Sequence, residues 1–168
     1  MTQSQLQELI LELYSSRPEM KEYFEFYLNP DVAALREKHY KLIDKELRRS
    51  KWGMSKARVS KLKQTIKKFE SFSPGFEAVA DFYLVVANRM ILDEGFVRFS
   101  DTLFNFMAFA VKKYLEIMDR NLMLDKGLAN VEKHLMNNSG ATRRMRTLVK
   151  EAVDNYLQEA LESSIEKQ

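Results

Sequence analysis

The sequence predicts an all-α fold, arranged as an irregular bundle or a short superhelical stack of seven to eight helices in a single domain over residues 1–168. Two observations carry this prediction. Gly (5) and Pro (3) are scarce in the 168 residues, which favours long helices because sheets need many turns. Apolar residues also recur at spacings of three and four almost everywhere, as on helices with one buried face, whereas no stretch alternates like a strand for long enough to matter.

Residues typical of helix N-caps mark the starts of the first three expected helices. Thr2 and Gln5 can form a capping box in front of the first apolar stripe, and Ser16 heads a second box. Asn29 is the expected cap of the third helix, with a proline at the first helical position. This helix is expected to run to about Arg49.

Two breaks delimit the fourth and fifth expected helices. The pattern stops at Gly53, and Ser55 caps a fourth helix that runs to about Ser71. Ser73 then caps a fifth helix, which a proline opens and which ends near Gly95.

The last three expected helices complete the chain. One runs from about Ser100 to Leu122, and a shorter one spans 126–136. Thr142 caps the final helix, whose apolar residues follow a clean amphipathic order.

The fifth and sixth expected helices are apolar around most of their circumference. A helix of this kind is covered on several sides. We therefore expect these two helices to form the centre of the fold, with the amphipathic helices packed around them. The side chains that we expect to be largely buried are Phe82, Val85, Val86, Phe104, Phe106, Met107, Phe109, Val111 and Tyr114.

The composition narrows the class of protein. The absence of Cys excludes disulfides, thiolate zinc sites, iron–sulfur clusters and Cys nucleophiles. The first residues lack the basic and continuous apolar regions of a signal peptide, and the longest apolar run, at 106–111, is far shorter than the ~20 residues of a membrane span. We therefore expect a cytoplasmic protein with no membrane partner.

Sequence signatures of enzymes are also missing. The five Gly are isolated, so no Gly-rich phosphate loop is present, and no Gly-x-Ser-x-Gly nucleophile motif occurs. Neither His39 nor His134 belongs to a His-Glu-x-x-His or Glu-x-x-His metal pattern. We expect a protein that is not an enzyme and that uses no metal and no cofactor.

His39 lies on the apolar face of the third expected helix, with Glu46 on the same face two turns later. One interpretation is a buried acid–base pair. The other, which we favour because buried polar groups are usually satisfied structural ones, is a His that is hydrogen-bonded inside the packing. Glu46 would then lie at its rim or pair with a Lys or Arg.

Positive charge is concentrated in residues 36–69. This segment holds 13 of the 27 Lys and Arg and three of the 24 acids, a net of +10, which leaves 14 basic and 21 acidic residues, a net of −7, for the rest of the chain. Such density creates a local positive potential that attracts anions.

Five residues of this segment are candidate binding residues. Lys56, Lys63 and Lys67 share one flank of the fourth expected helix, Arg58 lies on the other flank, and Trp52 precedes the helix. Trp52 can stack on a nucleic-acid base or close the edge of a core. The alternative for the lysines is an ordinary solvated face, since the acidic remainder of the chain can pair with it.

A second candidate site begins at the final helix. If Thr142 caps it, Arg143, Arg144 and Arg146 crowd its first turn, where cations oppose the helix dipole. Backbone N–H groups and Arg side chains together make an anion site. The alternative is that a Glu or Asp from a neighbouring helix neutralises these arginines.

Three stretches, "LQELILELYSSRPEMKEYFEFYLNP", "KARVSKLKQTIKKFESFSP" and "KHLMNNSG", resemble a bacterial family catalogued as domain of unknown function 6155. The similarity runs from about Leu6 to Tyr156. It implies a soluble, all-helical bacterial protein, and it implies no activity and no residue roles.

The function that we expect is that of a non-enzymatic interaction protein, which binds an anionic protein partner through a basic helical surface. The alternative is a nucleic-acid-binding protein that uses residues 36–69. The sequence shows no motif that would support that alternative, such as a zinc finger, an RNA-binding strand motif or a recognition-helix pair.

Overall fold

The structure is a computed structural model that describes residues 1–48, 57–94 and 99–165. Over these residues the chain forms helices and no strand, which confirms the predicted all-α class. In chain order they are α1 (Gln3–Ser16), α2 (Pro18–Leu28), α3 (Val32–Leu47), α4 (Val59–Ser71), α5 (Phe76–Glu94), α6 (Asp101–Arg120), α7 (Leu124–Val131), the π-helical segment η1 (Glu132–Met136) and α8 (Arg143–Ile165).

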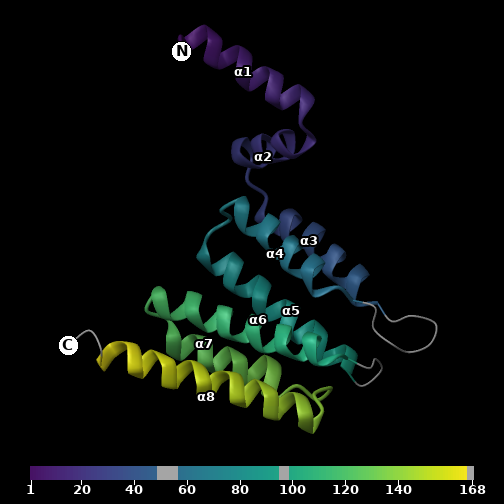
Figure 1. The fold of residues 1–168 in the computed structure, drawn as a ribbon, viewed down its shortest axis with the longest axis vertical. Coiled ribbons are helices and arrows are strands. Elements are labelled where there is room, and N and C mark those ends of the chain that lie inside the picture. The colour runs from purple at the N-terminus through teal and green to yellow at the C-terminus, as the bar shows by residue number, and fades with distance from the viewer. Residues whose placement is uncertain (49–56, 95–98, 166–168) are drawn as a thin grey trace.

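The helices succeed one another along the long axis of the molecule, from α1 at one end to α8 at the other (Figure 1). The most extensive contact between helices joins α5 and α6. On one side of this pair lie α3 and α4, and on the other side lie α7, η1 and α8. The central place predicted for the fifth and sixth helices is therefore confirmed.

The predicted core is nearly complete. Seven of the nine expected side chains are buried, and Phe106, Met107 and Tyr114 are at most 2% exposed. Val85 and Phe109 are only half-buried. The prediction was too strong for these two, because each lines a depression that is open to the surface.

The first and last predicted caps are confirmed. The Thr2 hydroxyl accepts from the Gln5 N–H at 3.3 Å, and the Gln5 side chain accepts from the Thr2 N–H at 2.8 Å. Thr142 Oγ1 accepts from the Met145 N–H at 3.3 Å, and α8 follows. Both motifs satisfy N–H groups that a helix start leaves without a partner.

Two other caps were predicted wrongly. Ser16 is the last residue of α1, and its hydroxyl donates to the Glu12 carbonyl at 2.7 Å instead of capping α2. Asp31, and not Asn29, caps α3, because its carboxylate accepts from the Ala34 N–H at 2.9 Å. A carboxylate is favourable there, since the start of a helix carries partial positive charge.

The starts of α4 and α5 also differ from expectation. Ser55 lies outside the described residues, and α4 begins at Val59 with Arg58 in the cap position. In front of α5, Ser73 and Gly75 have φ values of 51° and 97°. This left-handed turn delays the helix to Phe76, because such φ values do not belong to a right-handed helix.

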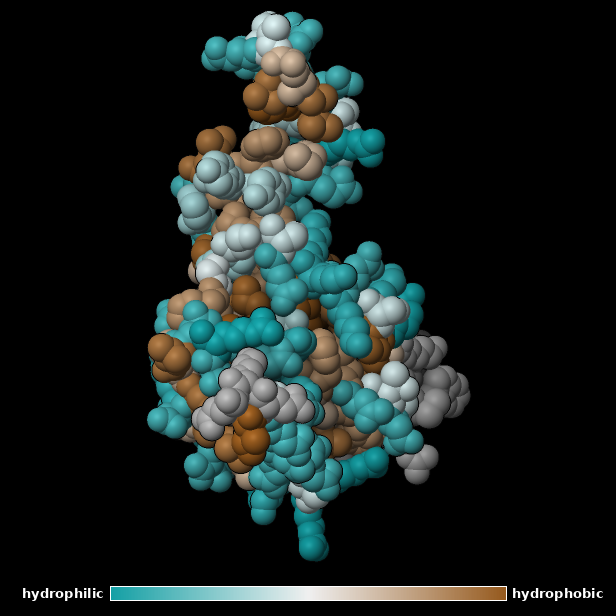
Figure 2. All heavy atoms as spheres, turned by 60° about the vertical axis from the view of Figure 1, so that its left-hand side comes forward, coloured by the Kyte–Doolittle hydropathy of each residue, from teal (hydrophilic) through white to brown (hydrophobic). Residues whose placement is uncertain are grey.

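The first two helices form an extension, which we call the arm (α1 and α2), above the body (α3 to α8) (Figures 1 and 2). No residue of either helix is buried. Phe72 of the loop after α4 links the arm to the body, because its ring lies 5.5 Å from that of Phe26 and 6.0 Å from that of Tyr23. Over the described residues, no helix has the length and apolarity that crossing a bilayer requires.

Candidate functional site

The structure gives different environments to the predicted binding residues. Trp52 and Lys56 lie outside the described residues. Lys63 and Lys67 are exposed on α4, and Arg58 is exposed at its start. The shared flank of three lysines is therefore described only for Lys63 and Lys67.

Arg58 is held by an acid of its own chain. Its side chain donates two hydrogen bonds to the Glu46 carboxylate, at 2.9 and 3.2 Å, and its backbone N–H donates a third at 2.9 Å. These bonds from Arg58 lower the pKa of Glu46. The expectation that Glu46 pairs with a Lys or Arg is confirmed, and Arg58 serves to join α3 to α4.

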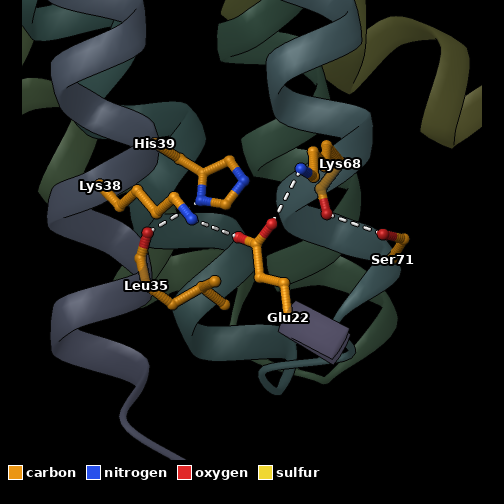
Figure 3. A network of polar contacts seen from close by, with 6 residues as sticks. All are labelled: Glu22, Leu35, Lys38, His39, Lys68 and Ser71. Carbon is orange, nitrogen blue, oxygen red and sulfur yellow. Dashed lines mark hydrogen bonds and ion pairs between the residues drawn. The ribbon is translucent and has the colours of Figure 1, made fainter. Parts of the chain in front are cut away.

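A second ion-pair cluster lies where the arm meets the body. Glu22 of α2 reaches between Lys38 of α3 and Lys68 of α4, with its oxygens 2.7 and 3.0 Å from their Nζ atoms (Figure 3). Burial raises the pKa of Glu22, but the hydrogen bonds and charges of the two lysines outweigh burial and leave it lowered.

His39 lies next to this cluster and is only 1% exposed (Figure 3). Its Nδ1 donates to the Leu35 carbonyl at 2.9 Å, and its ring lies within 6 Å of the rings of Phe69 and Phe72 (5.6 and 5.9 Å). Desolvation lowers its pKa, so the ring is neutral at pH 7. This geometry supports the structural interpretation of His39, since Glu46 pairs with Arg58 instead.

Lys63 and Lys67 of α4 line a depression between α4, α5 and α6, which we call the cationic groove. Its volume is about 350 Å³. The lining residues are Lys63, Ile66, Lys67, Glu70, Tyr83, Phe109, Lys113, Glu116, Ile117 and Arg120.

Four cations and two carboxylates line the cationic groove, which gives it a net charge of +2. Lys113 pairs with Glu116 at 2.6 Å. Within the described part of the chain, no acid forms an ion pair with Lys63, Lys67 or Arg120. These three cations are therefore available to an anion from outside.

The floor of the groove is apolar and aromatic. Ile66 is buried, Phe109 and Ile117 are half-buried, and Lys63 Nζ lies 4.7 Å from the centre of the Phe109 ring. This is a cation–π contact, which holds the lysine over the groove. A ligand in the groove would therefore meet positive charge above apolar surface.

Tyr83 and Glu70 close one wall of the groove. The Tyr83 hydroxyl donates to Glu70 Oε1 at 2.9 Å. Burial, and then the nearby Glu70 carboxylate, raise the pKa of Tyr83, so its hydroxyl keeps the proton at all physiological pH values. The hydrogen bond joins Glu70 of α4 to Tyr83 of α5 at this wall.

The second predicted site has internal partners. The Arg144 guanidinium lies 3.8 Å from the centre of the Phe104 ring and 3.6 Å from the Asp101 carboxylate. The Gly140 N–H donates to Asn138 Oδ1 at 2.8 Å. Arg143 is exposed. The neutralising acid from a neighbouring helix is thus present for Arg144, and anion binding at this loop stays a prediction.

Sequence reasoning missed Lys113, Arg120 and Tyr83. They belong to α5 and α6, far along the chain from residues 36–69, and only the packing of α4 against α5 and α6 brings them beside Lys63 and Lys67. No local spacing in the sequence carries this information.

Comparisons of the chain with models of protein families, with curated proteins and with solved structures gave no match. The resemblance to domain of unknown function 6155 therefore stays a prediction. Over residues 1–48, 57–94 and 99–165, no group of three or more His, Asp or Glu side chains is arranged to hold a metal ion.

Proposed function

We propose that the protein is a non-enzymatic interaction protein that binds an anionic protein partner in the cationic groove. The observation that carries this proposal is the combination, in one depression of about 350 Å³, of an apolar floor and three cations that pair with no acid of residues 1–48, 57–94 and 99–165. Glu22, Glu46 and Asp44 neutralise part of the remaining charge of α3 and α4, whereas none of these three acids pairs with Lys63 or Lys67.

A carboxylate on an amphipathic segment suits both parts of the groove. Lysine and arginine bind carboxylates through charge-assisted hydrogen bonds, while an apolar neighbour on the partner would cover Phe109 and Ile117. Covering apolar surface contributes about 25 cal/mol per Å². Charge complementarity alone would mainly increase the specificity and the association rate of the complex, and it would add less to the affinity.

The same geometry argues against a long nucleic-acid track. A duplex needs several phosphate contacts in a row, but Lys38, Lys68 and Arg58 are already bound to carboxylates. Glu70 and Glu116 also line the groove, so the groove offers no unbroken row of cations to a phosphate backbone. These features favour a protein partner over the nucleic-acid alternative.

A defined probe tests the proposal. The probe is a fluorescent helical peptide with Glu at positions i and i+4 beside leucines, titrated with the full chain at about 50 mM salt. Lys63→Gln with Lys67→Gln should raise its Kd about tenfold or more, a loss of about 1.4 kcal/mol. The matched control is Lys41→Gln with Lys45→Gln, two exposed lysines of α3 outside the groove.

The control removes the same charge and should change the Kd by less than about threefold. Equal losses in both variants, or no binding at about 1 mM protein, would refute the proposal. A 20-base-pair DNA duplex is the comparison ligand. Duplex binding that the groove variant loses, with no peptide binding, would establish the nucleic-acid alternative instead.

A further inference from the structure

A second depression, which we call the polar pocket, lies where α3, α5 and η1 meet. Its volume is about 190 Å³. The lining residues are Arg36, Asp81, Leu84, Val85, Asn88 and His134. The polar pocket shares no lining residue with the cationic groove, so it is a separate site whose ligand is independent of the partner of the groove.

Opposite charges line this pocket without neutralising each other. Arg36 of α3 and Asp81 of α5 are both exposed residues of its lining. Within the described part of the chain, neither side chain forms an ion pair, whether with the other or with a third residue. Two opposite charges that share one small cavity but do not pair leave a gap, which a ligand that carries both charges can bridge.

Asn88 adds an oriented amide to the pocket. Its Oδ1 accepts a hydrogen bond from Asn138 Nδ2 at 2.7 Å, and the same nitrogen donates to the His134 carbonyl at 3.3 Å. Because Oδ1 of Asn88 is occupied, its amide N–H groups, which have no partner among residues 1–48, 57–94 and 99–165, remain as donors. Asn88 is therefore prepared to donate to an oxygen of a ligand, such as a carboxylate.

His134 joins the lining from a π-helical turn. The Asn137 N–H donates to the Glu132 carbonyl at 2.8 Å, which is the i→i+5 bond of a π-helix, a rare turn that is frequent at functional sites. Within this turn Leu135 is buried in the core, while His134 is exposed and lines the pocket. The irregular turn thus adds an imidazole to the guanidinium, carboxylate and amide of the other two helices.

The rest of the lining is aliphatic. Leu84 is 8% exposed and Val85 is half-buried, and both side chains line the cavity. Its volume is that of about six water molecules, below the roughly 300–1,000 Å³ of pockets that hold drug-sized ligands. The polar pocket therefore suits a molecule with a few carbon atoms and is too small to enclose a nucleotide.

We propose that the polar pocket binds a small aliphatic α-amino acid as its zwitterion. The carboxylate of the ligand binds Arg36 and the Asn88 amide, and its ammonium group binds Asp81. Both pairings are charge-assisted hydrogen bonds, which are stronger than neutral ones. The aliphatic side chain of the ligand covers Leu84 and Val85. A ligand with only one of the two charges leaves the other charge of the pocket unmatched, which gives the site its selectivity.

Three probes of equal side-chain size test this site in the full chain. They are L-valine, isovalerate, which lacks the ammonium group, and isobutylamine, which lacks the carboxylate. Each is titrated at low and constant ionic strength, because salt screens exposed charges, and the backbone amides of residues 81–88 and 132–136 are followed by NMR. Valine should bind with a Kd of about 1 mM, and the two analogues should bind at least about tenfold more weakly.

Single neutral substitutions should reverse this preference. Asp81→Asn should weaken valine about tenfold and strengthen isovalerate about threefold, because it removes a charge that repels the carboxylate. Arg36→Gln should likewise weaken valine and strengthen isobutylamine. Opposite changes for two probes in one variant cannot come from a loss of folding. Asp154→Asn and Arg17→Gln, which make the same changes at exposed residues outside the pocket, should change each Kd by less than about twofold.

Three outcomes would overturn the amino-acid site. The first is valine that shifts no amide of the pocket up to about 20 mM. The second is valine binding that both Asp81→Asn and Arg36→Gln leave unchanged. The third is isovalerate or isobutylamine that binds the wild-type chain as tightly as valine does. Lys63→Gln with Lys67→Gln should leave valine binding unchanged, since neither lysine lines the polar pocket.

Discussion

His39 is the one described His side chain that is fully buried, and its position gives a pH-dependent stability. It lies beneath the Glu22, Lys38 and Lys68 cluster, among Phe69 and Phe72. Desolvation first, and then the charges of the two lysines, lower its pKa, while the bond to the Leu35 carbonyl and the Glu22 charge act the other way. The folded chain therefore resists protonation of this ring.

We expect the free energy of unfolding to fall as the pH drops below 6.5, the ordinary pKa of His. Below that value the unfolded chain binds a proton that folded His39 does not, and stability rises with pH wherever the unfolded state holds more protons. Urea unfolding at pH 7.5 and 5.5 measures the effect. His39→Phe, which keeps a ring between Phe69 and Phe72, should show a smaller drop.

The comparison isolates His39. Both chains contain His134, so its contribution cancels when their pH dependences of unfolding are subtracted. Glu22, whose pKa is lowered from 4.5, loses its contribution to the free energy of unfolding only below the lower of the two pH values compared. Equal pH dependence in the two chains would mean that His39 is protonated in the folded state.

Gly127 provides a second prediction for a single residue. It is buried in α7, and a Cβ there would lie 3.0 Å from Met118 Cβ and 3.2 Å from Met118 Cγ. Gly→Ala usually stabilises a helix by up to about 1 kcal/mol, but overpacking a core costs about 1–3 kcal/mol. We expect Gly127→Ala to lower the free energy of unfolding by about 1–2 kcal/mol in urea. A gain in stability would show that α7 can move away from α6.

At the scale of the elements, α6 is the helix on which the body is packed. Nine of its residues are buried, and it contacts α5, α7, α8 and α4. An aromatic contact also joins α6 to α5, because the ring centres of Phe109 in α6 and Tyr83 in α5 are 6.3 Å apart. Removing a large side chain from α6 therefore leaves a cavity that several helices would have to close together.

We expect Phe106→Ala to lower the free energy of unfolding by about 3–5 kcal/mol. Phe106 is 2% exposed, and Phe76, in the first turn of α5, is 40% exposed. Phe76→Ala is the matched control and should cost less than about 1 kcal/mol, because half-exposed side chains lose little on truncation. A similar cost for both changes, measured by urea unfolding, would contradict the central position of α6.

At the scale of the whole molecule, the arm and the body differ in how they are stabilised. The body shares one continuous cluster of buried apolar residues, which begins at Leu35 and reaches Tyr156. The arm contributes only half-buried Phe26 to the edge of that cluster. Its attachment depends on Phe72 and on the Glu22 ion pairs, which are partly exposed and of the kind that contributes about 0–1 kcal/mol.

We expect the backbone amides of α1 to exchange with deuterium faster than those of any other described helix. Local opening is easiest where few apolar contacts must be broken, and α1 buries no residue. Hydrogen–deuterium exchange followed by mass spectrometry measures this. The amides of α6 serve as the slow internal reference, and equal protection of α1 and α6 would contradict the isolation of the arm.

The sequence by itself determined the all-helical class, the central pair of helices and the terminal caps. Each of these depends on contacts within a few residues or on how much of one helix is apolar, as for the Thr2–Gln5 box and the apolar circumference of α5 and α6. Its errors at Asn29 and Ser73 were also local. Residue spacing does not show whether Asn29 or Asp31 caps α3, because both residue types are good helix caps. Spacing also does not reveal the positive φ of Ser73 in the turn before α5.

Only the tertiary structure decided which cations are neutralised and which face outward. Lys68 binds Glu22 from 46 residues away, and Arg58 binds Glu46 from 12 residues away, so the count of +10 overstated the charge that a partner meets. Lys63 and Lys67 gained Arg120 and an apolar floor from α6. The same packing left the stripe of α1 uncovered, because amphipathic spacing states that a helix has an apolar face but not which surface covers it.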